Sequence, residues 1–179
     1  RSLCFRNAIL IISSIFFYAW GEPLFVLLML LSIFFNWLFG LGVAKFKDSD
    51  KGKAKIFIAL SVVINLGMMF VFKYLTFTLT NINLLFNTNL DTLNIALPIG
   101  ISFFTFQAMS YVIDVYRGVK VQKNPANLGM YVSFFPQLIA GPIVRYTTIE
   151  KQIHNRRVTF DSFGEGVRRF LIGFNKKML

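Results

Sequence analysis

The feature that most constrains the fold is an apolar run at residues 24–41. These eighteen residues include only Ser32 and Asn36 as clearly polar members. An α-helix rises about 1.5 Å per residue, so the run would extend about 27 Å, close to the thickness of the hydrocarbon core of a bilayer. The sequence therefore predicts a helix that crosses a membrane. Three further runs are predicted to do the same: 7–20, 56–79 and 95–116.

The composition indicates that lipid is the solvent for much of the surface. Hydrophobic residues make up 55% of the 179 residues and charged residues make up 15%, whereas about 25% is usual for charged residues in soluble domains. A chain of this length keeps a large surface, and so few charges could not cover so many apolar side chains. We therefore expect the lipid bilayer to be a main partner.

The charged residues predict the orientation of these helices. The net charge is +11, which in a soluble protein would suggest binding to nucleic acid. Here the basic residues lie in short clusters between the apolar runs, with five Lys at 45–55 and further Lys and Arg at 117–123. Loops of this kind stay on the cytoplasmic side, whereas Glu22 and Asp91 lie in loops predicted on the opposite side. Four crossings satisfy all these loops, and no nucleic-acid partner is expected.

Residues 128–144 break this alternation. The segment is apolar enough to enter the membrane, but basic residues flank it on both sides, so a full crossing would place one basic cluster on the wrong side. Pro136 and the pair Gly141-Pro142 interrupt the apolar run and favour a re-entrant hairpin. Backbone groups left unpaired at that depth need protein or a water-filled cavity around them. The segment is therefore predicted to line a cavity.

The last segment, 160–179, has a different pattern. Apolar residues recur there at steps of three and four, with basic residues beside them, which is typical of an amphipathic helix in the membrane interface. The predicted fold class is therefore all-α. It is a polytopic helical membrane protein with about four transmembrane helices, a re-entrant helical hairpin and an amphipathic interfacial helix, in one membrane domain, 1–179.

Polar residues inside the predicted fourth helix are the first candidates for chemistry. The side chains of Gln107, Ser110, Tyr111 and Asp114 are spaced to share one helical face. Polar residues at membrane depth usually face a bundle interior or a pathway, so Gln107, Ser110 and Tyr111 are candidate tunnel-lining residues. For Asp114, a structural alternative is an ion pair with Arg117, less than one turn further on.

Three residues later in the chain are weighed in the same way. Gln137 follows Pro136 in the re-entrant segment, where it either lines the cavity or caps broken backbone. Arg145 comes directly after the hairpin and is either an orientation signal or a cation beside the cavity. His154 is the only histidine, and its polar, basic surroundings favour a solvated loop residue over a general base.

Other chemistry is not indicated by the residues. Cys4 is the only cysteine, so no intrachain disulfide can form, and no ligand spacing of the zinc type surrounds His154. No nucleotide-binding motif and no nucleophile elbow occurs, and no metal is expected. The residues alone leave two readings open: a transporter or channel with a re-entrant pore loop, and an intramembrane enzyme.

Four blocks of the sequence resemble the membrane-bound O-acyltransferase family. They read FFYAWGEP at 16–23, LPIGISFFTFQAMSYVIDVYRG at 97–118, FFPQLIAGPIVRY at 134–146 and GVRRFLIGFNKKML at 166–179. Their order and spacing are similar to the family's across nearly the whole chain. The resemblance is closest to the branch of the alginate O-acetyltransferase membrane subunit.

The resemblance implies a multi-pass enzyme of the bacterial cytoplasmic membrane. Family members pass an acyl group from a cytoplasmic donor, expected here to be acetyl-CoA, to hydroxyls of an extracytoplasmic polysaccharide, directly or through an extracytoplasmic acetyltransferase partner. Arg145 is then a donor-side candidate. The family's catalytic histidine is expected beyond the block at 166–179, so no catalytic residue is assigned here. The sequence resembles an N-terminal and central fragment, which we expect to be inactive alone.

Overall fold

The structure is a computed structural model that describes residues 3–92, 95–138, 141, 144–156 and 159–178. These residues form helices joined by loops, and they include no strand. The prediction of an all-α membrane protein is confirmed.

Three helical stretches of the described chain are long and apolar enough to cross a membrane. They are α1 (Leu3–Gly21), α2 (Phe25–Phe46) and the continuous stretch Lys51–Phe86. Each contains most of one predicted span and extends beyond it at one or both ends. The protein is thus a multi-pass membrane protein by the length and composition of its helices.

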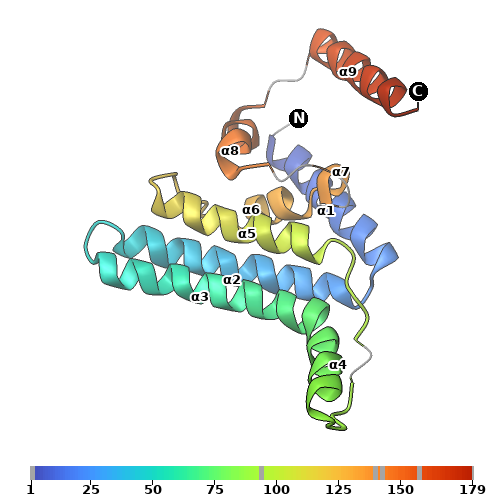
Figure 1. The fold of residues 1–179 in the computed structure, drawn as a ribbon. Coiled ribbons are helices and arrows are strands. Elements are labelled where there is room, and N and C mark those ends of the chain that lie inside the picture. The colour runs from blue at the N-terminus through green and yellow to red at the C-terminus, as the bar shows by residue number, and fades with distance from the viewer. Residues whose placement is uncertain (1–2, 93–94, 139–140, 142–143, 157–158, 179) are drawn as a thin grey trace.

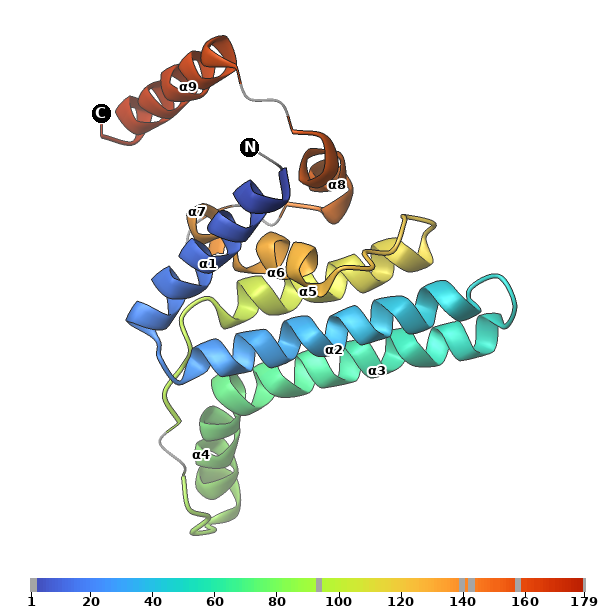
Figure 2. The ribbon, with the colours of Figure 1, turned by 180° about the vertical axis from the view of Figure 1, so that it is seen from behind.

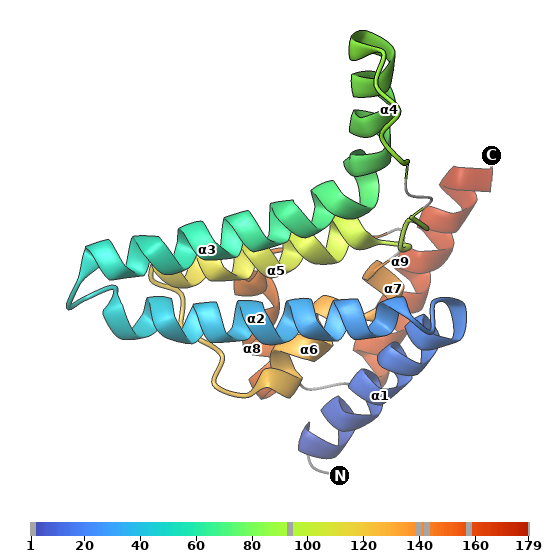
Figure 3. The ribbon, with the colours of Figure 1, turned by 90° about the horizontal axis from the view of Figure 1, so that it is seen from below.

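The predicted span at 95–116 corresponds to a shorter helix, α5 (Ile101–Tyr116). This helix has 16 residues, or about 24 Å, because its start is set by Pro98 and Gly100. The residue before a proline is disfavoured in helical geometry, and Gly100 has a φ of 75°, which favours glycine. α5 packs against α2 and α3 (Lys51–Met69), and the three helices lie side by side in Figures 1 and 3.

Polar side chains join α2 to α3 inside the bundle. Asn36 and Asn65 exchange two amide hydrogen bonds of 3.1 and 2.8 Å, and the Ser61 hydroxyl donates to Asn36 Oδ1 over 2.9 Å. All three residues are 1% exposed. Hydrogen bonds of this kind hold membrane helices together where hydrophobic burial cannot, because lipid is as apolar as the helix surface.

The helix that starts at Lys51 changes direction near its middle. Residues Phe70–Tyr74 form a π-helical turn, η1, and α4 (Leu75–Phe86) then leaves α3 at a steep angle, as Figure 2 shows. A π-turn inserts one extra residue and interrupts the regular ladder of backbone hydrogen bonds, which is a known cause of kinks. The stretch predicted as one span, 56–79, is therefore bent, and the helix continues beyond residue 79 to Phe86.

The predicted re-entrant segment begins with two short helices, α6 (Pro125–Ser133) and α7 (Phe135–Leu138). Asn124 caps α6 by accepting a hydrogen bond from the backbone N–H of Ala126 over 2.9 Å, and Pro125 suits the first helical position. α6 packs against α1 and α2, and all side chains from Leu128 to Ser133 are buried. Residues 139, 140, 142 and 143 of the segment, including Pro142, lie outside the described residues.

The path of this segment doubles back along α5. The backbone of Tyr131 accepts a hydrogen bond from Gln107, in the middle of α5. Leu138 lies beside Gly100, at the start of α5, where a Cβ on Gly100 would be 3.0 Å from the Leu138 carbonyl oxygen. The ring of Tyr146 then packs against Tyr111, back toward the end of α5. This is the shape that a re-entrant hairpin requires, and its placement in a bilayer stays a prediction.

Two amphipathic helices end the described chain. α8 (Tyr146–Asn155) packs on α1, α5 and α6, and it buries Tyr146 and Ile153. α9 (Phe160–Met178) matches the predicted helix at 160–179, apart from residue 179, which is not described. Every described side chain of α9 is exposed, and the helix stands apart from the bundle in Figure 1.

Candidate functional site

Three tyrosines from three helices meet where α5, α6 and α8 pack together. Tyr111, Tyr131 and Tyr146, here called the tyrosine cluster, are each at most 1% exposed. The ring of Tyr146 lies edge-on to both others, with centroid distances of 5.1 Å to Tyr111 and 5.4 Å to Tyr131. Edge-to-face packing is a favoured arrangement of aromatic rings, so the cluster fixes the three helices relative to one another.

The hydroxyls of the cluster bind backbone and amide groups. Tyr131 donates to the carbonyl of Val144 over 2.6 Å. This bond joins α6 to the second arm of the doubled-back segment. Burial raises the pKa of Tyr146 to about 12, because desolvation disfavours the phenolate. Tyr146 therefore keeps its proton near neutral pH.

Gln122 connects this cluster to the loop that follows α5. Its backbone N–H donates to the Tyr111 hydroxyl over 3.1 Å, and its Nε2 donates to the Tyr146 hydroxyl over 3.1 Å. Its backbone carbonyl accepts from the indole N–H of Trp37 over 3.1 Å. The sequence interpretation missed Gln122, because a glutamine in a basic linker gives no sign that aromatic residues from distant segments will bury it.

His154 lies on α8 and not in a loop, as the sequence had suggested. Its Nε2 is 3.3 Å from Nε2 of Gln122, and its side chain is exposed. The predicted solvent exposure holds, whereas the predicted loop does not, because Tyr146, Ile149 and Ile153 recur at three- and four-residue steps and form the apolar face of a helix.

Two of the predicted tunnel-lining residues make hydrogen bonds within the fold. Gln107 is 2% exposed, and its Nε2 donates to the Tyr131 carbonyl over 2.8 Å. Ser110 donates to the carbonyl of Gln107 over 2.8 Å. Together with Tyr111, they occupy the face of α5 that meets α6 and the tyrosine cluster. That face was predicted from the spacing, and a tunnel beside it stays a prediction.

The other two predicted site residues lie elsewhere. Gln137 is on α7, half-buried, and its carbonyl accepts a hydrogen bond from the Gly141 N–H over 2.9 Å. Because its neighbour Leu138 lies beside Gly100, Gln137 lies near the start of α5, at the opposite end from the tyrosine cluster. Arg145 precedes α8 and is exposed, directly beside the buried Tyr146. The structure thus does not bring Gln137 together with Arg145.

Asp114 is the buried carboxylate of α5. It is 6% exposed, and its Oδ2 has no hydrogen-bond partner. The ion pair with Arg117 that the sequence suggested does not form among the described residues. Arg117 follows the last turn of α5 and is exposed, whereas Asp114 points into the protein.

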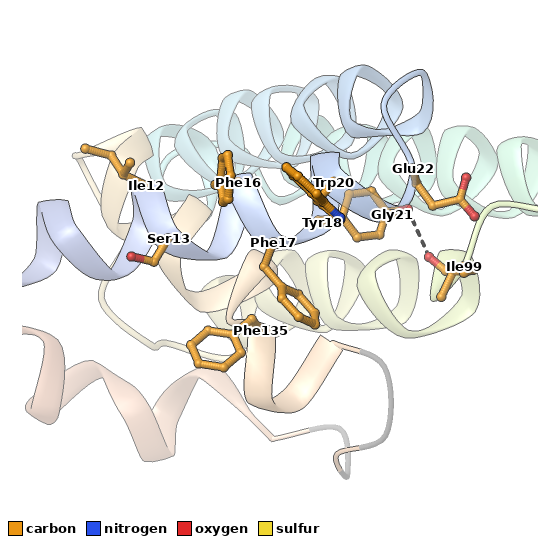
Figure 4. A pocket seen from close by; sticks show the side chains of 10 residues that line it. All are labelled: Ile12, Ser13, Phe16, Phe17, Tyr18, Trp20, Gly21, Glu22, Ile99 and Phe135. Atoms are coloured by element: carbon orange, nitrogen blue, oxygen red, sulfur yellow. Dashed lines mark hydrogen bonds between the residues drawn. The ribbon is translucent and has the colours of Figure 1, made fainter.

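An apolar pocket of about 600 Å³ lies beside the C-terminal half of α1. Figure 4 shows Phe16, Phe17 and Trp20 on α1, with Phe135 from α7 opposite. The Tyr18 hydroxyl donates to the Ile99 carbonyl over 2.9 Å, which ties α1 to the segment before α5. The charged residue in the lining is Glu22. Such a surface suits hydrocarbon, since it offers few polar partners.

Among the described residues, no three His, Cys, Asp or Glu side chains gather into a group that could hold a metal ion.

Comparison with known proteins gives the family. The chain is 37% identical over 178 residues to a probable alginate O-acetylase AlgI from Pseudomonas aeruginosa, a match that covers 97% of this chain and 34% of that protein. The corresponding protein from Pseudomonas putida is 36% identical, with 97% and 37% covered.

A third relative has another named substrate. The peptidoglycan O-acetyltransferase of Helicobacter pylori is 30% identical over 198 residues, which cover 95% of this chain and 37% of that protein. This chain belongs to the membrane-bound O-acyltransferase family. It spans about a third of the length of the curated relatives that it matches. No family model and no solved structure matches it.

The blocks that resemble the O-acyltransferase family come together in the fold. The block at 97–118 contains α5 with Tyr111, and the block at 134–146 contains α7 and Tyr146. They meet at both ends of α5, at Gly100 with Leu138 and at Tyr111 with Tyr146. In this chain the two blocks therefore form one structural unit, although a basic linker separates them in the sequence.

Proposed function

We propose that this chain is part of a membrane-bound O-acetyltransferase that acetylates hydroxyls of a cell-surface polysaccharide. The observation that carries the proposal is the similarity over 97% of the chain to proteins named as alginate O-acetylases. The peptidoglycan O-acetyltransferase among the relatives supports the same reaction on a different glycan. The shared element is a sugar hydroxyl as acceptor.

The donor in this proposal is acetyl-CoA on the cytoplasmic side of a bacterial inner membrane. The oxygen of the acceptor hydroxyl forms a new bond to the acetyl carbon, the thioester C–S bond breaks, and a general base takes the hydroxyl proton. The coenzyme leaves as a thiolate and is protonated. The acceptor is reached directly or through an extracytoplasmic acetyltransferase partner.

The described residues would form the wall of such a site and not its catalytic centre. The doubled-back segment and the polar face of α5 place Gln107, Ser110 and Tyr111 between α5 and α6. Arg145 is exposed beside the tyrosine cluster and would face the phosphates of the donor, since a guanidinium binds phosphate oxygens well. Gln137 would line the opposite end of the same wall.

The test uses the full-length protein in a strain that lacks its own copy. We expect Arg145→Ala to raise the apparent KM for the acetyl donor by about tenfold, because one charge-assisted contact is lost. Gln137→Ala should lower the acetyl content of the polysaccharide. Lys151→Ala is the matched control, since it removes a basic charge from an exposed position on α8, the helix that Arg145 precedes.

Acetyl content is measured after alkaline release, and donor kinetics are measured in membrane vesicles. If both variants acetylate at the wild-type rate, the assignment of these residues to the donor path is wrong. If the full-length protein transfers no acetyl group but mediates solute flux in proteoliposomes, the hypothesis of a transporter or channel replaces the proposal.

A further inference from the structure

A pocket of about 300 Å³ opens where the loop after α5 meets α8. Its polar and charged lining residues are Lys120, Gln122, Lys123, Tyr146, Glu150 and His154. The loop belongs to the basic cluster predicted on the cytoplasmic side. Tyr146 belongs both to the lining of the pocket and to the tyrosine cluster.

The charges of this pocket are not neutralised by the protein. The ion pairs among the described residues are Asp50 with Lys53 and Glu165 with Arg169, so Lys120, Lys123 and Glu150 form none there. Two lysines against one glutamate leave a formal charge of about +1 with a neutral histidine. Both lysines are exposed and free to turn toward a ligand.

Hydrogen-bond donors lie at the floor of the pocket. Gln122 is 5% exposed, and its Nε2 lies 3.1 Å from the Tyr146 hydroxyl and 3.3 Å from His154 Nε2. Tyr146 accepts in its bond with Gln122, so its own O–H proton stays available for a ligand. If His154 likewise accepts from Gln122, its Nδ1–H is a further donor.

This set of groups suits an anion that has several acceptor oxygens. Two ammonium groups, a phenol and an imidazole N–H all donate, and a phosphate group offers several strong acceptor oxygens and negative charge. The volume is at the lower end of the range for ligand pockets, which fits a phosphate with a small substituent. We propose that this pocket binds a phosphate group, carried either by the headgroup of an anionic lipid or by a soluble phosphate compound.

Glu150 provides a test of the proposal that predicts a gain of affinity. A carboxylate repels an anion, so its presence would keep affinity low, and its removal should raise affinity. A general loss of folding cannot produce such a gain. The inference does not depend on acyl transfer, because it uses only the groups that line this pocket.

The experiment has two arms, both with the full-length protein. In the first, calorimetry measures the binding of inorganic phosphate to protein in nanodiscs of phosphatidylcholine. In the second, native mass spectrometry measures how many phosphatidylglycerol molecules the protein retains from a mixture of the two lipids. Binding in the first arm identifies a soluble phosphate compound as the ligand class, and retention in the second identifies a lipid headgroup.

The expected changes are the same in whichever arm shows binding. The double variant Lys120→Ala/Lys123→Ala should weaken affinity by about tenfold or more, and Tyr146→Phe by about threefold. Glu150→Gln should strengthen it by about threefold. The control is Lys51→Ala/Lys55→Ala, which removes the same charge from exposed positions at the start of α3.

Two results would overturn the proposal. One is the absence of binding in both arms. The other is equal weakening by the pocket pair and the control pair, which would mean that only the net charge matters. Unchanged unfolding temperatures of the variants show that the comparison concerns binding and not folding.

Discussion

At the scale of single residues, close packing around Tyr111 is the most demanding feature of the bundle. Gly40 on α2 lies against the Tyr111 ring, and a Cβ at Gly40 would be 2.7 Å from Cε1 and 2.9 Å from the hydroxyl. That hydroxyl accepts the backbone hydrogen bond from Gln122. Any displacement of the ring therefore also disturbs the loop after α5.

We expect Gly40→Ala to lower the free energy of unfolding by about 1–3 kcal/mol, the usual range for added volume in a packed core. The matched control is Gly67→Ala on α3, where a Cβ meets nothing within 4 Å. Because alanine favours helix more than glycine does, this change should leave the free energy of unfolding the same or raise it. Unfolding in mixed micelles with increasing sodium dodecyl sulfate gives both values. Equal stability of the two variants would contradict the packing around Tyr111.

The amide pair of Asn36 and Asn65 gives a second prediction. Asn65→Ala removes both amide hydrogen bonds with Asn36 and the bond that Asn65 donates to the Ser61 carbonyl, and we expect a loss of about 1–2 kcal/mol. The double variant Asn36→Leu/Asn65→Leu removes both amides and should recover part of that loss. The same unfolding assay measures the two effects. A double variant less stable than Asn65→Ala would show that the polar pair cannot be replaced by packing.

Sequence reasoning reached some of these residues and not others. The spacing of Gln107, Ser110 and Tyr111 placed them on one face of α5, and the structure agrees. Gln122 could not be found in this way, because its burial depends on Tyr146 and Trp37, which lie 24 and 85 residues away. Local composition marks a residue as polar, but it does not reveal which distant side chains will surround it.

At the scale of helices, the start of α3 depends on one carboxylate outside the membrane-spanning part. Asp50 is the N-cap residue, and its Oδ1 accepts a hydrogen bond from the Lys53 N–H over 3.1 Å. This bond and the Lys53 ammonium group hold the pKa of Asp50 below its usual value. Stabilisation by a carboxylate with a lowered pKa is fully present above the unfolded-state pKa and is lost as the pH falls through the folded-state pKa.

We therefore expect the first turn of α3 to fray when the pH falls below about 4, the ordinary pKa of Asp. Amide hydrogen exchange at Lys53 and Ala54 should speed up there, relative to the intrinsic exchange rate at each pH. Asp50→Asn keeps a capping oxygen that does not titrate, so its protection should not change with pH. Asp50→Ala should be frayed at every pH. If Asp50→Asn shows the same pH dependence as the native sequence, Asp50 is not the titrating group.

The helices themselves were predictable to different degrees. Apolar runs located α1, α2 and α3, because hydrophobic length is written directly in the sequence. The π-turn at Phe70–Tyr74 was not predictable, since the residues on either side of it are equally apolar. α8 was missed because its ten residues are mostly polar, and only Tyr146, Ile149 and Ile153 mark its buried face.

At the scale of the whole molecule, the path of the doubled-back segment predicts on which side of the membrane its two flanks lie. α6 begins after Asn124, two residues beyond Gln122 in the loop that follows α5. His154, in the last turn of α8, lies 3.3 Å from the same Gln122. If the segment is re-entrant, residues on either side of it face the same compartment. That expectation combines the charge pattern of the loops with the path of the chain.

Cysteine labelling tests it directly. We expect Asn124→Cys and Lys151→Cys, both at exposed positions, to react with a membrane-impermeant maleimide only when the cytoplasmic face is open. Asp91→Cys should react from the other side. Cys4 is exposed and is replaced by Ser in all variants. Labelling of positions 124 and 151 from opposite sides would exclude the re-entrant hairpin.

The contact between α1 and α8 has a consequence for how the protein is made. Asn7 donates to the carbonyl of Ile153 over 3.1 Å and accepts from Arg156 over 3.1 Å. The ribosome makes Asn7 first and needs on the order of ten seconds to make its partners, at the usual rate of synthesis. During that time the Asn7 amide lacks these two partners. Its final position is therefore settled only late in synthesis, and insertion factors have an interval in which to hold it.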